Sequence, residues 1–128
     1  MSRSVKKVLI VEDDLSLRPI WENYFKSSRD KIWIEWAVSC EQALVIIAET
    51  NRLRQYFTLI VSDVFLAGSG TGLDLMKSQP VKESRARKVL ISAVDRDELM
   101  QQFGHSLPDT EIISKPLDLK KLNFIMVA

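Results

Sequence analysis

Near its N-terminus the chain reads Val8-Leu9-Ile10-Val11-Glu12-Asp13-Asp14, four apolar residues followed at once by three acidic ones. The apolar run is too short for a helix and is rich in β-branched residues, which is typical of a buried strand in a parallel sheet. The carboxylates therefore stand where that strand ends. We expect a functional site there, because sites in open parallel sheets form beyond the carboxyl ends of the strands.

Four more strand-like stretches follow, and stretches of helical length separate them. The predicted strands are Ile32 to Val38, Leu59 to Val61, Val89 to Ile91 and Ile112-Ile113. Apolar residues at helical spacing lie between them, and one such stripe comprises Leu17, Ile20, Tyr24 and Phe25. The alternation predicts an α/β fold, a doubly wound five-stranded parallel sheet with helices on both faces, because parallel neighbours need a crossover helix.

Two local features concern the starts of helices. Pro19 falls about one turn into the first predicted helix, where proline removes a backbone donor, so that helix is expected to start late or to bend. Ser39 and Gln42 are spaced as in a capping box, which predicts the start of the second helix just after Ser39.

Composition predicts one domain over residues 1–128, and the 12 residues after Pro116 are expected to build a last helix and no second domain. The formal net charge is +1, which provides no overall field for nucleic acid or an anionic membrane. Cys40 stands alone, and no apolar run approaches the roughly 18 residues that span a bilayer. We therefore expect a soluble, cytoplasmic protein that does not bind nucleic acid or membranes directly.

Polar side chains also stand at the ends of three later strands, namely Asp63, Ser92 and Lys115. In the fold described above they converge with Glu12 and Asp13 on one rim of the sheet. Three carboxylates at close quarters repel each other, and one is expected to protonate unless a cation compensates. Mg²⁺ is the natural cation, since it takes oxygen ligands and is commonly bound through one or two carboxylates together with phosphate oxygens. This pattern predicts phosphoryl chemistry.

The same residue types suit a phosphoryl acceptor. An aspartate oxygen of Asp63 can attack phosphorus if nearby positive charge stabilises the phosphoryl oxygens, and Mg²⁺ and Lys115 would supply it. Ser92 could then donate a hydrogen bond to the attached group and couple it to movement of the following loop. Pro116 follows Lys115, and a cis bond between them would aim the lysine inward; the sequence leaves the isomer open.

Five motifs in one order carry this pattern: Val8-Leu9-Ile10-Val11-Glu12-Asp13-Asp14, Leu59-Ile60-Val61-Ser62-Asp63, Gly68 with Gly72-Leu73, Val89-Leu90-Ile91-Ser92-Ala93, and Lys115-Pro116. In this order and spacing they resemble the receiver domain of two-component response regulators over nearly the whole chain. The resemblance implies the sheet order 2-1-3-4-5. It also implies that Asp63 takes its phosphoryl group from a histidine kinase or a phosphotransfer protein.

The resemblance further implies a set of metal ligands and a mode of action. Asp13 and Asp63 would bind Mg²⁺ directly, Phe65 would contribute its backbone carbonyl, and Glu12 would act through water. Asp14 would be a bystander or a helix cap. The chain would be a phosphoryl-accepting regulator rather than an enzyme with substrate turnover, and its modification would switch binding to an unidentified downstream protein, with dimerisation a further possibility.

Departures from the family pattern leave alternatives open. The loop 66–72 is one residue longer than usual, and Ile112 stands where the family often has an aromatic switch residue. Isoleucine has no hydroxyl group, so a pseudo-receiver scaffold that binds proteins without phosphorylation is the main alternative. A hydrolase that turns over an aspartyl phosphate is disfavoured, because Phe65 stands where such enzymes typically have their second aspartate.

Overall fold

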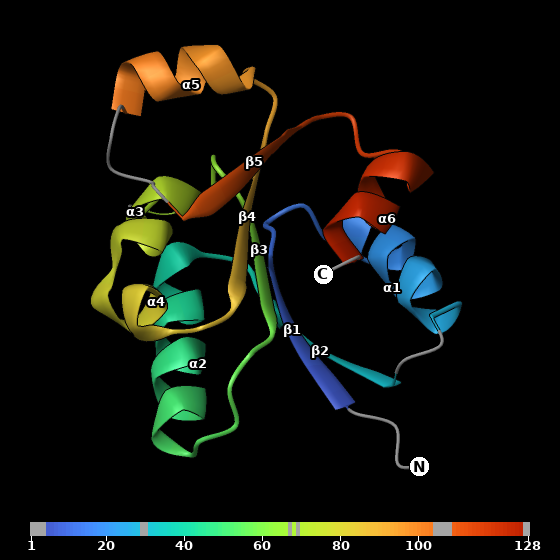
Figure 1. The fold of residues 1–128 in the computed structure, drawn as a ribbon, viewed down its shortest axis with the longest axis vertical. Helices are drawn as coiled ribbons and strands as arrows, with labels where there is room; N and C mark the ends of the chain where they lie inside the picture. Colours follow the sequence, from blue (N-terminus) through green and yellow to red (C-terminus); the bar gives the residue numbers. More distant parts are fainter. Residues whose placement is uncertain (1–4, 29–30, 67, 69, 104–108, 127–128) are drawn as a thin grey trace.

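The computed structural model describes residues 5–28, 31–66, 68, 70–103 and 109–126, and its centre is one sheet of five parallel strands (Figure 1). The strands are β1 (Val5–Val11), β2 (Lys31–Ala37), β3 (Leu59–Asp63), β4 (Arg87–Ser92) and β5 (Thr110–Ser114). They lie in the order β2-β1-β3-β4-β5, and every neighbouring pair is parallel. The predicted doubly wound sheet is confirmed, with β2 and β5 at its edges.

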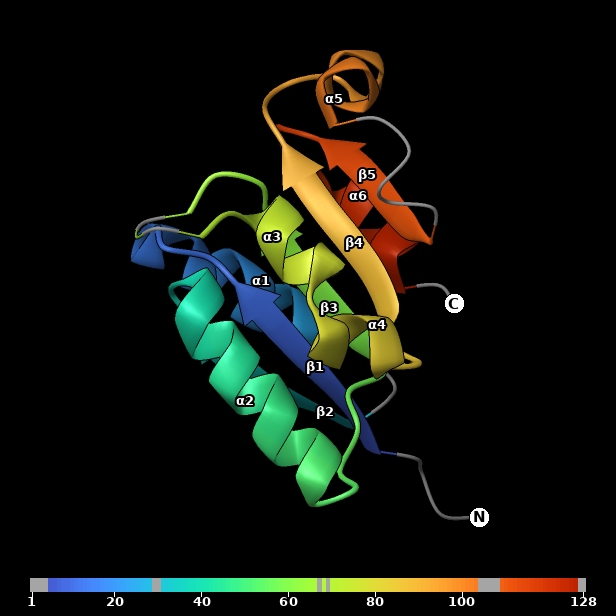
Figure 2. The same cartoon turned by 90° about the vertical axis from the view of Figure 1, so that its left-hand side faces the viewer.

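Helices cover both faces of the sheet (Figure 2). On one face lie α1 (Arg18–Lys26), which follows a short 3₁₀ turn at Leu15–Leu17, and α6 (Leu119–Met126). On the other lie α2 (Cys40–Arg52), α3 (Gly72–Lys77), α4 (Gln79–Glu83) and α5 (Arg96–Phe103). Within the described residues, no helix has the length and apolar character needed to cross a membrane.

Alternate residues of each strand point to opposite faces, so the sheet separates two apolar cores. Leu9, Ile60 and Leu90 pack on the side of α2, whereas Ile10 and Val89 pack with Trp21 of α1 on the other side. All five residues of β3 are buried. The central strands are therefore held on both faces, and their carboxyl ends form a fixed platform.

Four of the strands, β1, β3, β4 and β5, are longer than the apolar runs that predict them, whereas β2 has the predicted length and begins and ends one residue earlier. Arg87 and Lys88 open β4 and pair with Leu59 and Ile60, and β3 continues through Ser62 to Asp63. Backbone pairing needs no apolar side chain, so it continues beyond the buried run at either end. Asp63 thus lies within its strand rather than after it.

Both predictions about helix starts are confirmed. Pro19 lies in the first turn of α1, which begins only after the 3₁₀ turn, and Asp14 caps that turn by accepting a hydrogen bond from the backbone N–H of Ser16. The Ser39 side chain accepts from the backbone N–H of Gln42 at 3.1 Å, where α2 begins. The two caps therefore set where the helical segments after β1 and β2 begin.

Arg87, the first residue of β4, joins the edge strand and the last helix. Its guanidinium donates a hydrogen bond to Glu111 of β5 at 2.8 Å and others to the backbone carbonyls of Phe124 and Ile125 in α6. The hydrogen bond from Arg87 holds the pKa of the Glu111 carboxyl below its ordinary value of 4.5, although burial acts in the opposite direction. The ionised form of Glu111 is therefore favoured by folding.

Replacing Glu111 by glutamine should lower the free energy of unfolding at neutral pH by about 1 kcal/mol, the upper end for a partly exposed ion pair. Because the folded-state pKa is lowered, this stabilisation is present above the ordinary pKa and disappears as the pH falls through the lowered one. Urea unfolding from neutral to strongly acidic pH should show the difference between parent and variant shrinking toward zero. Glu83→Gln, at an exposed position of α4, is the control; a Glu111→Gln difference that grows with acid would contradict the argument.

Candidate functional site

The structure brings the predicted site residues together at the carboxyl ends of four strands. Asp63 ends β3 and Ser92 ends β4, while Glu12 and Asp13 follow β1 and Lys115 follows β5. The strands end level with one another: Val11 pairs with Ser62, Asp63 with Ile91, and Ser92 with Ser114. Residues more than 100 positions apart in the chain therefore meet on one rim.

Three carboxylates form the centre of this rim. Glu12, Asp13 and Asp63 each offer one carboxylate oxygen, and these oxygens lie within 4.8 Å of one another. Glu12 and Asp63 are buried, with 7% and 6% of their surface exposed, whereas Asp13 is exposed. The open side of the cluster thus faces solvent at Asp13.

The pKa of Glu12 reflects its burial and the other acids beside it. Burial raises the pKa of Glu12 to about 8, and a side-chain hydrogen bond with Asp63 and the charge of Asp63 add to the effect. The backbone N–H of Asp14 donates to the Glu12 carboxylate at 3.3 Å, which opposes the rise. Three acids at close quarters repel each other, and a divalent cation bound between them would relieve that repulsion. All three residues supply oxygen, the donor Mg²⁺ prefers, so the cluster fits this metal.

Lys115 provides the positive charge of the site. Its ammonium nitrogen lies 3.0 Å from the Oδ1 oxygen of Asp63. Burial would lower the pKa of Lys115, but the hydrogen bond and charge of Asp63, together with the charges of Glu12 and Asp13, outweigh it and raise the pKa. The lysine is therefore charged throughout the physiological range. Its backbone N–H donates to the carbonyl of Ser92 at 2.8 Å, and the Lys115–Pro116 bond is cis.

Ser92 is buried at the end of β4 and has a defined orientation. Its hydroxyl oxygen accepts a hydrogen bond from the backbone N–H of Val94 at 3.0 Å. The hydroxyl hydrogen remains able to donate elsewhere. The side chain thus ties the first residues of the β4–α5 loop to the rim, and its role toward a phosphoryl group stays a prediction.

The chain after Asp63 passes close to the rim before it enters α3. The side chain of Phe65 is 62% exposed, and the role of its backbone carbonyl as a metal ligand stays a prediction. The backbone N–H of Gly72 donates to the carbonyl of Val64 at 2.8 Å. A Cβ atom on Gly72 would lie 2.0 Å from the carbonyl oxygen of Asp63, so only glycine fits here. Gly72 belongs to the motif, but its contact with the strand of Asp63 is not visible in the sequence.

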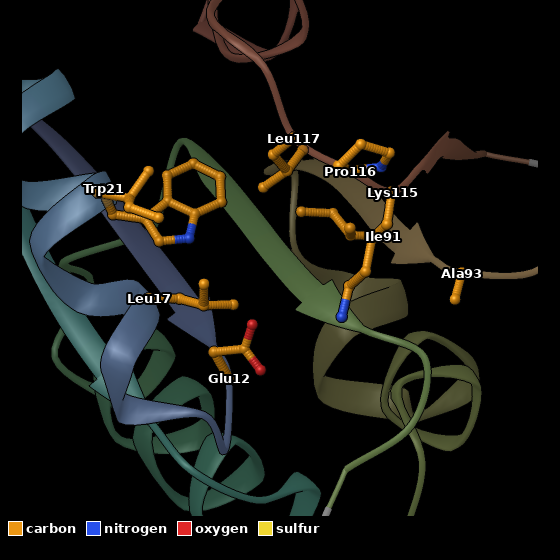
Figure 3. Close-up of a pocket in the computed structure, with 9 residues that line it drawn as sticks. Glu12, Leu17, Trp21, Ile91, Ala93, Lys115, Pro116 and Leu117 are labelled. Atoms are coloured by element: carbon orange, nitrogen blue, oxygen red, sulfur yellow. The ribbon is translucent and has the colours of Figure 1, made fainter.

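A hollow of about 470 Å³ adjoins the acidic cluster (Figure 3). Glu12 and Lys115 stand at its polar end, and the side chains of Trp21 and Leu117 form part of its apolar wall. Trp21 is 2% exposed, as expected for a core residue. The rim therefore combines a charged centre with an apolar recess.

Ile112 is the residue that stands where receiver domains often have an aromatic switch residue. It is partly buried and packs against the core on the side of α2, and it also lines a surface hollow with Phe124 of α6. An isoleucine in this place is a packing residue of β5. Its side chain carries no hydroxyl group, so it cannot report its position in the way that an aromatic switch residue with a hydroxyl would.

Comparisons with solved structures agree with the fold described above. No protein-family profile matches the sequence, and no curated protein does either. Among solved structures, the chain is similar to a response regulator receiver domain protein from Methanospirillum hungatei JF-1, with a TM-score of 0.72, 21% identity and 94% and 90% of the two chains covered. It is also similar to a two-component response regulator from Cytophaga hutchinsonii, with a TM-score of 0.74, 22% identity and coverage of 96% and 95%.

A third similar structure is a two-component response regulator from Clostridium difficile, with a TM-score of 0.73, 23% identity and coverage of 93% and 90%. Each likeness covers nearly all of both chains, so it concerns the whole fold rather than a shared fragment. At these identities the likeness shows the fold alone. The chain has the fold of response-regulator receiver domains.

Proposed function

We propose that this chain is a phosphoacceptor receiver domain of two-component signal transduction, in which Asp63 takes a phosphoryl group from a histidine kinase or a phosphotransfer protein. The observation that carries the proposal is the pairing of a buried Asp63 with Lys115 at 3.0 Å, inside a cluster of three carboxylates. This arrangement supports a nucleophilic oxygen, a candidate metal site and a cation that act together. Phosphoryl transfer needs positioning and charge stabilisation above all.

Each residue has a distinct part in the reaction. Asp13 and Asp63 would hold Mg²⁺ directly, Phe65 through its backbone carbonyl, and Glu12 through water. When bound, Mg²⁺ supplies positive charge that offsets the charge on the phosphoryl oxygens. A carboxylate oxygen of Asp63 attacks phosphorus, the bond from phosphorus to the donor breaks, and the donor leaves with the bonding electrons. Lys115 then moves its hydrogen bond from Asp63 to a phosphoryl oxygen.

The attached group would act as a switch. The Ser92 hydroxyl donates a hydrogen bond to a phosphoryl oxygen. The same hydroxyl accepts the hydrogen bond from Val94 at the start of the β4–α5 loop, so a movement of the Ser92 side chain moves this loop. A change at Asp63 is thereby passed to the surface of β4 and β5, where a downstream protein would bind. In this proposal, residues 1–128 form one regulatory domain. The domain works in the cytoplasm and does not bind nucleic acid directly.

The test is intact-mass analysis after exposure to acetyl phosphate, with and without Mg²⁺. With Mg²⁺ the protein should gain the mass of one phosphoryl group, while acetate is released. Removing the metal with a chelator should abolish the gain, because the three acids would then repel the incoming phosphate. Peptide mapping after reduction with borohydride should locate the group on Asp63. A folded protein that gains no phosphoryl group at any Mg²⁺ concentration would favour the pseudo-receiver scaffold.

Replacing Lys115 by methionine should slow phosphorylation by acetyl phosphate about 100-fold, the usual effect of removing one donor aimed at developing charge. Methionine keeps much of the length of the side chain, so the apolar wall of the hollow is preserved. Lys120→Met, at an exposed position of α6, is the matched control and should leave the rate unchanged. Initial rates of mass gain at saturating Mg²⁺ measure both. Equal rates in the two variants would remove Lys115 from the mechanism.

A further inference from the structure

The outer edge of β2 presents backbone hydrogen-bonding groups that no strand of the described residues pairs with. Ala37 accepts a hydrogen bond from the backbone N–H of Glu12 at 2.9 Å, so its backbone faces β1. Because strand residues alternate, the N–H and C=O groups of Ile32, Ile34 and Trp36 face the opposite way. Among the described residues, no strand lies beyond β2 on that side. These three residues therefore offer an open ladder to a further strand.

Most of the devices that protect a sheet edge are absent from β2. Natural edges are shielded by proline, bulges, short strands, charged side chains or a covering helix or loop. β2 contains no proline or glycine, pairs with β1 without a break over its seven residues, and reads Lys31-Ile32-Trp33-Ile34-Glu35-Trp36-Ala37. Its only charged residues are one lysine and one glutamate, four positions apart on the same face. A strand of this kind is suited to pairing.

We propose that β2 is a self-association edge, at which a second copy of this chain adds its own β2 antiparallel about a two-fold axis at Trp33. The two five-stranded sheets would then form one continuous sheet of ten strands. Trp33 would lie opposite Trp33 of the second copy, and Ile32 opposite Ile34. Lys31 would lie opposite Glu35 of the second copy, and the two-fold axis repeats this ion pair.

Charge selects this register over its neighbours. An axis at Glu35 would place the two glutamates opposite each other, which is destabilising. An axis at Ile34 would set Glu35 against Trp33 and Lys31 against Ala37, so neither charge would meet its opposite. The axis at Trp33 alone satisfies both charges. It also makes Ile32 and Ile34 a hydrogen-bonded pair, which agrees with the outward direction of their backbone groups.

The surface around Trp33 has exposed aromatic side chains and a hollow that a second copy could cover. Trp33 and Tyr56 are 56% and 54% exposed, and with Lys7 and Gln55 they line a hollow of about 460 Å³. The indole N–H of Trp33 donates to the Glu35 carboxylate at 3.0 Å, which holds that carboxylate on the face where Lys31 of the second copy would arrive. Pairing would cover the exposed indole. A contact confined to one strand is small, so the dimer should be weak and dependent on concentration.

The proposal goes beyond the phosphoacceptor function and is independent of it. β2 lies at the edge farthest from β4 and β5, so neither Ser92 nor Lys115 takes part. The Asp63→Asn protein should dimerise as the parent does.

Sedimentation equilibrium over a range of concentrations tests the proposal with charge reversals. Lys31→Glu and Glu35→Lys should each raise the dissociation constant of the dimer at least tenfold, which corresponds to ~1.4 kcal/mol. Each reversal sets like charges opposite one another twice. An equimolar mixture of the two variants should recover the parental dissociation constant, because every glutamate then meets a lysine. Glu83→Lys, on α4, is the control for a change in net charge and should dimerise normally.

Three results would overturn the proposal. One is a parent protein that stays monomeric at the highest concentration it tolerates. Another is a dimer that neither reversal weakens, and the third is a mixture of the two variants that does not associate. Thermal unfolding of each variant confirms that it is folded, so a loss of dimer is not a loss of structure.

Discussion

Replacing Asp63 by asparagine is expected to abolish the uptake of a phosphoryl group from acetyl phosphate. The amide oxygen of asparagine is a far weaker nucleophile than a carboxylate and does not form a stable phosphoryl adduct. The replacement also removes one charge from the cluster of Glu12, Asp13 and Asp63, which weakens its attraction for Mg²⁺. Intact-mass analysis of parent and variant under the same conditions should show the adduct in the parent only.

The matched control for this experiment is Asp14→Asn. Asp14 follows directly on Glu12 and Asp13, but its side chain caps the 3₁₀ turn by accepting hydrogen bonds from Ser16. Asparagine caps a helical turn as well as aspartate does, so this variant loses a neighbouring charge and keeps the fold. It should gain the phosphoryl group normally. An adduct that survives in Asp63→Asn, or disappears in Asp14→Asn, would place the acceptor elsewhere.

The positions of the site residues could be predicted from the sequence because they follow from a local rule. Each polar side chain closes a short apolar run, and parallel strands bring their carboxyl ends to one edge of the sheet. Asp63, Ser92 and Lys115 meet for this reason. The same runs underestimate the strands themselves, since pairing at Arg87 and Lys88 leaves no apolar signal.

Two features of the site depend on distances that no local pattern contains. The raised pKa of Glu12 results from its burial and its hydrogen bond with Asp63, which lies 51 positions later in the chain. The sequence predicts that one of the three acids protonates without a cation, but not which one. In the same way, the contact of Gly72 with the backbone of Asp63 exists only after β3 and α3 have packed. The sequence therefore predicts the residue types of the site but not the distances between them.

Gly72→Ala is expected to destabilise the fold by about 3 kcal/mol or more, which is large for the addition of one methyl group. The new Cβ would lie 2.0 Å from the carbonyl oxygen of Asp63 and 2.9 Å from the hydroxyl oxygen of Ser62. The carbonyl oxygen cannot withdraw easily, because β3 is buried and paired on both sides. The first turn of α3 must therefore move away and lose the hydrogen bond from Gly72 to Val64.

Gly68→Ala separates this clash from a general effect of losing a glycine. Gly68 has a φ of +94°, which costs alanine about 1 kcal/mol, but its nearest neighbour is the flexible carboxylate of Glu41 at 3.3 Å. Urea unfolding should therefore show a loss at Gly72 at least twice that at Gly68. Phosphorylation should also be slower in Gly72→Ala when it is measured at urea concentrations at which both proteins are folded. The reason is that the clash lies at the end of β3, which carries the acceptor Asp63. Equal losses of stability in the two variants would mean that α3 can shift without cost, and that the close approach to Asp63 does not hold the acceptor in place.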